Sequence, residues 1–133
     1  MPNDVADWTN VHRIQLWDWF QPHQANPTDV NPSVSQPAIA GVRLIIAHIG
    51  VTFLCGTGNS QSAIVGLTES GPPSRVMWGD VIGVPATAGV VDRIERSDLA
   101  LVGTIGVGLT LTIQGLTMAA GNFAYLNMGG YFA

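Results

Sequence analysis

The sequence predicts an all-β protein, an antiparallel β-sandwich or jelly roll with an extended N-terminal arm. Three observations indicate this class. The 133 residues include 16 Gly and 8 Pro, which favours many short strands joined by tight turns. Apolar and polar residues alternate along several segments, as a half-buried strand requires; the clearest is Leu109–Gln114. Four prolines near the N-terminus recur every five residues, which excludes a regular helix there.

Aromatic residues concentrate before these prolines. The segment Trp8–Phe20 has an ambiguous period that fits both a strand and a helix. Next to a proline-rich arm, such a cluster is typical of an anchor that docks into an apolar pocket on a partner. Burial in the core of its own domain fits the same residues equally well. The candidate anchoring residues are Trp8, Trp17, Trp19 and Phe20.

Residues 21–37 are predicted to form the arm. Pro22, Pro27, Pro32 and Pro37 each follow a Gln or an Asn. Proline removes a donor from any sheet ladder and keeps the preceding residue extended. We therefore expect an extended segment without regular structure, with no helix and no central strand. Such an arm wraps its own domain or reaches a neighbour, and a surface loop is the plain alternative.

The chain therefore divides into an aromatic segment and proline-spaced arm over residues 1–37 and a β-sandwich domain over residues 38–133. In the second part, runs of apolar and β-branched residues are separated by Gly, Pro and Ser turn signals. Gly50 interrupts the longest apolar run. Strands are predicted at residues 42–55, 62–68, 75–84, 90–95, 99–102, 106–114 and 123–131.

From Leu99 to Ala133 the chain contains no Asp, Glu, Lys or Arg, whereas about a quarter of an ordinary domain is charged. A face made of hydroxyls and amides costs less to desolvate than a charged one, so it suits contact with another protein. The two-residue period places Leu109, Leu111 and Ile113 toward the core. It places the candidate interface residues on the opposite side: Thr110, Thr112 and Gln114.

Composition excludes several classes of partner. The net charge is −4, and the few basic residues are scattered, so we expect no nucleic-acid partner. All basic residues are Arg, a bias found at interfaces that compositional drift explains equally well. Residues 99–116 are long enough to span a membrane without a charge, but their Thr, Gln and Gly content and two-residue period argue against it. We expect no membrane partner.

The usual signatures of chemistry are missing. His12, His23 and His48 have no second ligand at zinc spacing. The single Cys55 follows apolar residues, which indicates a buried core thiol, and its odd separation from His48 places the two on opposite faces of a strand. The charged segment Asp92–Asp98 is typical of a solvated edge strand that guards against edge pairing. We therefore expect no enzyme, no catalytic residues, no cofactor and no metal.

Three segments resemble small β-sandwich structural proteins of tailed bacteriophage virions, such as capsid-decorating and head-fibre proteins. They are Trp78–Ala86, Asp98–Leu111 and Leu126–Tyr131. The shared pattern is a strand, an L-V-G-T-x-G turn, an alternating strand and a last strand that ends in Gly-Tyr. The likeness covers roughly residues 40–133. It implies a virion structural role, homo-oligomers that are often trimers, and no cofactor or catalytic residue.

The expected function is that of a capsid-decorating or head-surface attachment protein, assembled in the host cytoplasm and located in the virion. Its expected partners are further copies of itself, most simply in a trimer, and the major capsid protein or another virion protein. The N-terminal arm is expected to dock on the capsid lattice. The alternative is a β-sandwich module that binds carbohydrate, with Trp78 and Asp80 on one face of a strand as its ligand site.

Overall fold

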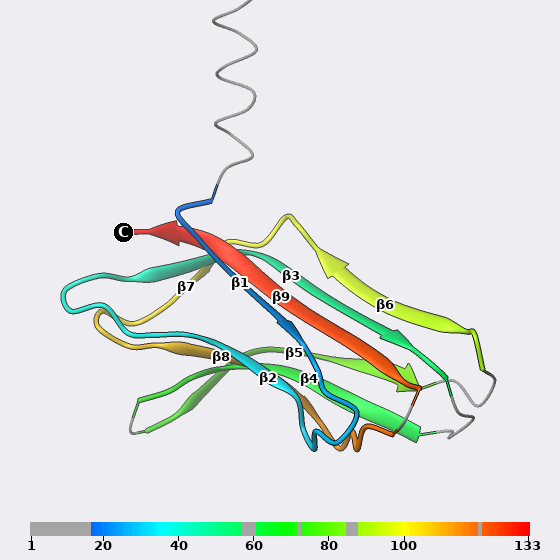
Figure 1. Cartoon of the computed structure of the whole chain (residues 1–133). Coiled ribbons are helices and arrows are strands. Elements are labelled where there is room, and N and C mark those ends of the chain that lie inside the picture. The colour runs from blue at the N-terminus through cyan, green and yellow to red at the C-terminus, as the bar shows by residue number, and fades with distance from the viewer. Residues whose placement is uncertain (1–16, 57–60, 72, 85–87, 120) are drawn as a thin grey trace, which may run out of the picture.

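The structure is a computed structural model, and it describes residues 17–56, 61–71, 73–84, 88–119 and 121–133. These residues form β-strands and connecting turns, with no helix among them. Figure 1 shows the strands as two layers packed face to face. The predicted all-β antiparallel sandwich is therefore confirmed.

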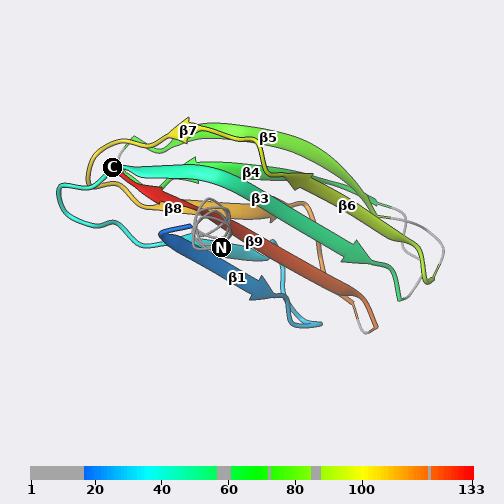
Figure 2. The ribbon, with the colours of Figure 1, turned by 90° about the horizontal axis from the view of Figure 1, so that it is seen from above.

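The first sheet is the upper layer in Figure 1 and lies toward the viewer in Figure 2. Its strand order is β1, β9, β3, β6, and a short β7 pairs with β3 next to the end of β6. The second sheet has the order β2, β8, β4, β5, and every pairing in both sheets is antiparallel. The strands span β1 Trp19–Gln24, β2 Ser33–Gln36, β3 Leu44–Leu54, β4 Gln61–Glu69, β5 Arg75–Val84, β6 Val91–Arg96, β7 Leu101–Val102, β8 Leu109–Gln114 and β9 Phe123–Phe132.

The core lies between the sheets and is built by side-chain alternation. On β8, Leu109, Leu111 and Ile113 are fully buried. The residues between them face away from the core, so the predicted register of this strand is confirmed. Cys55 is also buried in the core, as predicted.

Strand β3 is irregular at Ala47, and not at Gly50 as the sequence indicated. The pairing of β3 with β9 shifts between Ile46 and His48. This extra residue reverses the alternation of the strand. The buried side chains that face the core from β3 are therefore Leu44 and Ile46 before the shift, and Ile49, Val51 and Phe53 after it. Gly50 lies inside the continuous strand.

The prediction that residues 21–37 lack regular structure is wrong. Part of this segment pairs with β9 as β1, and part pairs with β8 as β2, so both strands lie before the predicted boundary at residue 38 and belong to the sheets. Each is an edge strand, which agrees with the expected absence of helix and of central strand. The segment therefore packs across its own domain.

Pro22 is accommodated because it lies in an edge strand. The N–H of Ala25 donates to the carbonyl of Ala124, so every second residue of β1 counted from Ala25 faces the ladder. Pro22 lies at one of the alternate positions, which face away from the ladder, so the N–H group that proline lacks would have pointed to solvent. The proline spacing therefore permits an edge strand where it would have broken a central one.

Polar contacts join the two sheets at both lateral edges. At one edge, Gln21 Nε2 donates to Gln36 Oε1 at 2.9 Å, linking β1 to β2. At the other edge, the N–H of Gly83 donates to Asp92 Oδ2 at 2.8 Å, and Arg96 pairs with Asp80 at 3.5 Å. The edges of the sandwich are therefore closed by side chains and not by further strands.

Trp19 belongs to the core of its own domain. Its side chain is 6% exposed, and its indole N–H donates to the carbonyl of Tyr131 at 3.2 Å. The neighbouring Phe20 points the other way and is 45% exposed. Trp8 lies outside the described residues.

Replacing this indole tests whether the N-terminal strand is integral to the fold. Trp19→Ala should lower the free energy of unfolding by about 3–5 kcal/mol, because it leaves a cavity between the sheets. Phe20→Ala is the matched control, and its outward ring should cost less than about 1 kcal/mol. Urea unfolding followed by circular dichroism measures both. Equal costs would show that β1 is not held by its buried side.

Candidate functional site

The outer face of the second sheet has no charged side chain among its described residues. The outward positions follow from the strand registers and from the buried positions between them. They are Ser33 and Ser35 on β2, Thr110, Thr112 and Gln114 on β8, Ile64, Gly66 and Thr68 on β4, and Val76, Gly79 and Val81 on β5. Thr110, Thr112 and Gln114, predicted as interface residues, lie together on this face.

This face combines neutral polar groups with exposed apolar ones. The hydroxyl of Thr110 lies 3.0 Å from that of Ser35 and 3.3 Å from that of Ser70, so part of the polar half is hydrogen bonded within the chain. Ile64, Val76 and Val81 are 55%, 73% and 61% exposed. The apolar half comes from β4 and β5. It was not among the predicted interface residues, because these two strands lie outside the uncharged C-terminal segment.

The structure does not bring the N-terminal candidates to this face. Trp17 and Phe20 stack on each other over the first sheet, with ring centroids 5.8 Å apart, and Trp19 is buried. The prolines lie along the edges: Pro22 in β1, Pro27 in an exposed turn, Pro32 buried before β2, and Pro37 exposed after it. The anchor interpretation is therefore wrong for Trp19, which fills its own core.

Trp78 and Asp80 do not form an exposed platform. They share a face of β5, as predicted, but Trp78 is partly buried and packs against the core. Asp80 pairs with Arg96 and accepts a hydrogen bond from the N–H of Val81. The aromatic ring of the expected ligand site is therefore partly covered by the protein's own core.

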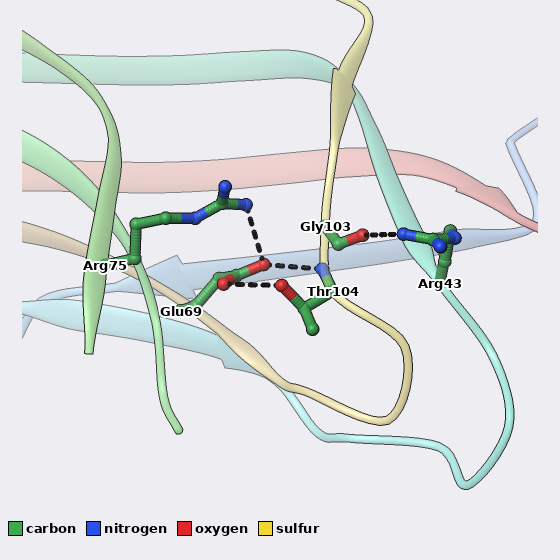
Figure 3. A network of polar contacts seen from close by, with 5 residues as sticks. All are labelled: Arg43, Glu69, Arg75, Gly103 and Thr104. Atoms are coloured by element: carbon green, nitrogen blue, oxygen red, sulfur yellow. Dashed lines mark hydrogen bonds and ion pairs between the residues drawn. The ribbon is translucent and has the colours of Figure 1, made fainter. Parts of the chain in front are cut away.

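A buried carboxylate ties the second sheet to the loop between β7 and β8 (Figure 3). Glu69 is 5% exposed. Its Oε1 accepts hydrogen bonds from the N–H of Thr104 at 2.6 Å and from Arg75 at 3.1 Å, and its Oε2 accepts one from the Thr104 hydroxyl at 3.0 Å. Arg43 donates to the carbonyl of Gly103 at 3.2 Å from the other side of the loop. The predicted strand at residues 62–68 ends before Glu69, and nothing in the sequence pattern indicates this network.

The carboxylate of Glu69 stays ionised because its partners outweigh its burial. Burial alone would raise its pKa, but the two hydrogen bonds from Thr104 and the hydrogen bond and charge of Arg75 lower it below the ordinary value of 4.5. Each partner donates to the carboxylate and holds it in place. We interpret the network as a structural clamp.

The described residues hold no group of three His, Cys, Asp or Glu side chains that could bind a metal ion. His48 lies on the outer side of β3 and Cys55 on the inner side, as their spacing predicted. No helix of sufficient length and apolar character to cross a membrane is found in the part of the chain that the structure describes.

Comparison with known proteins assigns no family. No family model matches the chain, and no curated protein matches it. Among solved structures, an arabinose-bound α-L-arabinofuranosidase is 14% identical with a TM-score of 0.39, over 81% of this chain and 23% of the enzyme. A structure described as CBM4 is 11% identical with a TM-score of 0.34, over 81% of this chain and 89% of that one. The chain thus spans about a quarter of the enzyme, and likenesses this weak carry nothing about activity.

The clamp gives the stability of the protein a defined pH dependence. Since the pKa of Glu69 is lower in the folded chain, the carboxylate stabilises the fold above about pH 4.5 and loses that effect as the pH falls through the lowered value. Glu69→Gln should reduce the free energy of unfolding by about 1–3 kcal/mol near neutral pH, and the gap to wild type should shrink below about pH 4.5.

Urea unfolding of both proteins across this pH range measures the gap. Glu95→Gln is the control, because Glu95 is exposed on β6 and has no side-chain partner among the described residues. A gap at Glu69 that stays constant down to acidic pH would contradict the clamp.

Proposed function

We propose that the protein is a non-enzymatic structural protein of a virion, and that it self-associates through the outer face of its second sheet. The observation that carries the proposal is the uncharged face with Ile64, Val76 and Val81 exposed on it. The virion setting rests on the resemblance of residues 78–86, 98–111 and 126–131 to bacteriophage decoration and head-fibre proteins.

The chemistry of the face favours a second copy of the same chain as its occupant. A surface of one charge sign would repel its own copy, whereas hydroxyls both donate and accept hydrogen bonds and can pair with themselves. The exposed apolar side chains gain from removal from water. The expected order is a trimer, in which each contact joins two different patches of neighbouring subunits, so this face would supply at least one side of every contact.

The major capsid protein or another virion protein is the proposed second partner. Because β1 and β2 belong to the sheets, docking is limited to side chains that stay exposed with both strands in place. Among the candidate anchors within the described residues, these are Phe20, Pro22, Pro27 and Pro37. Many copies that each bind weakly would still attach firmly to a lattice.

Charge placed on the neutral face should break the assembly. Thr112→Asp brings a carboxylate into each contact, where desolvation and repulsion between subunits should weaken association about a hundredfold. Thr28→Asp, at an exposed turn residue outside the four strands of this face, is the matched control and should leave the oligomer intact. Sedimentation velocity over a concentration series measures both.

The wild-type oligomer should also persist from low to molar sodium chloride, because neutral contacts are not screened by salt. A monomer at micromolar concentration, dissociation by salt alone, or a Thr112→Asp protein that assembles normally would each contradict the proposal.

A further inference from the structure

The outer face of the first sheet differs sharply from that of the second. It contains a groove of about 210 Å³, and its lining includes the polar or charged residues His48, Thr52, Arg93, Glu95, Tyr125 and Asn127. We propose that this groove binds a single neutral sugar ring, as a terminal or exposed unit of a glycan. The site goes beyond the proposed structural role and lies on the opposite face of the sandwich.

Two rows of residues across three strands build the groove. Tyr125 on β9 pairs with Thr52 on β3, which pairs with Arg93 on β6. In the next row, Asn127 lies opposite Gly50 and Gly50 opposite Glu95. Figure 2 looks down onto these three strands side by side. The lining residues come from distant parts of the sequence, and rigid strands hold them.

Gly50 allows Asn127 to reach across β3. A side chain at Gly50 would come within 2.8 Å of Asn127 Oδ1, so only glycine leaves room for the carboxamide there. Oδ1 accepts a hydrogen bond from His48 Nε2 at 2.7 Å. His48 Nδ1 lies 3.0 Å from the Ser97 hydroxyl, so both ring nitrogens have partners within the chain. With Oδ1 occupied, the amide N–H groups of Asn127 have no partner among the described residues.

Trp17 fixes the orientation of the His48 ring by stacking on it. Its ring stacks on the imidazole with centroids 4.9 Å apart and an interplanar angle of 20°. The indole packs so closely over Gly129 that a side chain there would collide with it, at 2.6 Å from Trp17 Cε3. His48 lines the groove, and Trp17 stacks on it without lining the groove itself, so the stacked imidazole orients Asn127 through its hydrogen bond.

The charges in the groove select a neutral ligand. Arg93 and Glu95 lie two residues apart on one side of the edge strand β6, and neither side chain has an ion-pair partner in the described part of the chain. Their opposite signs balance, so the groove favours neither an anion nor a cation. A ligand that both donates to the carboxylate and accepts from the guanidinium satisfies both, and sugar hydroxyls do so.

The size and the aromatic lining agree with a sugar ring. Clefts for drug-sized ligands are about 300–1,000 Å³, so this groove suits one ring and not a longer apolar molecule. Tyr125 is half-buried, and its hydroxyl has no partner among the described residues. It therefore offers a ring for stacking together with a polar end for hydrogen bonding.

Saturation-transfer NMR on the full chain tests the site, with methyl glycosides of glucose, galactose, mannose, xylose and N-acetylglucosamine as probes. At least one glycoside should receive saturation from the protein. Arg93→Ala should weaken its binding about tenfold or more, and Glu95→Gln should also weaken it, because each removes a charge-assisted hydrogen bond. Both residues are exposed, so both variants should remain folded.

Arg96→Ala is the matched control. Arg96 is the same residue type on the same strand, but it pairs with Asp80 at the sandwich edge and does not line the groove. The proposal is overturned if no glycoside receives saturation, if Arg93→Ala and Glu95→Gln both bind like wild type, or if Arg96→Ala loses as much affinity as Arg93→Ala. Thr112→Asp should bind the glycoside normally, which separates this site from the association face.

Discussion

The reversal of alternation in β3 is the constraint on which the rest of the structure depends. The strand is apolar almost throughout, and the irregularity at Ala47 lets it direct a continuous row of large side chains into the core. The partner strand accommodates the shift with Gly130, because a side chain there would collide with the carbonyl oxygen of Ile45. The same reversal turns His48, Gly50 and Thr52 outward. One extra residue thus completes the core and creates the floor of the groove.

The two outer faces then diverge in chemistry. The second sheet presents hydroxyls, glycines and exposed branched side chains with no described charge, whereas the first presents a histidine, an amide, a tyrosine and two opposite charges around a hollow. A neutral extended face is suited to a large flat contact, because little desolvation opposes it. Convergent polar groups in a small concave site are suited to a small polar ligand. The proposed self-association through one face would therefore leave the other face open.

The sequence predicts the features that depend on local pattern. Strand β5 has the predicted bounds, and the alternation of β8 is correct, because a two-residue period is visible in the chain itself. Features that depend on distant neighbours were missed. The proline spacing argues against strands at β1 and β2, and only their edge positions, which the sequence does not reveal, make these strands possible. The irregularity at Ala47 is concealed because the run of residues around it is uniformly apolar. The role of Glu69 depends on Thr104 and Arg75, which lie beside it only in the folded chain. The groove likewise consists of residues that only strand pairing brings together.

The N-terminal strands β1 and β2 limit how this chain can contact a partner. The strands β1 and β2 close one lateral edge of the sandwich, joined by the hydrogen bond between Gln21 and Gln36, while Trp19 seals the core beneath them. An arm that released these strands to bind a capsid would expose that core and two unpaired sheet edges, which favours aggregation over docking. Any partner of the described domain therefore meets β1 and β2 as parts of a folded sandwich, in which these strands hold one lateral edge closed.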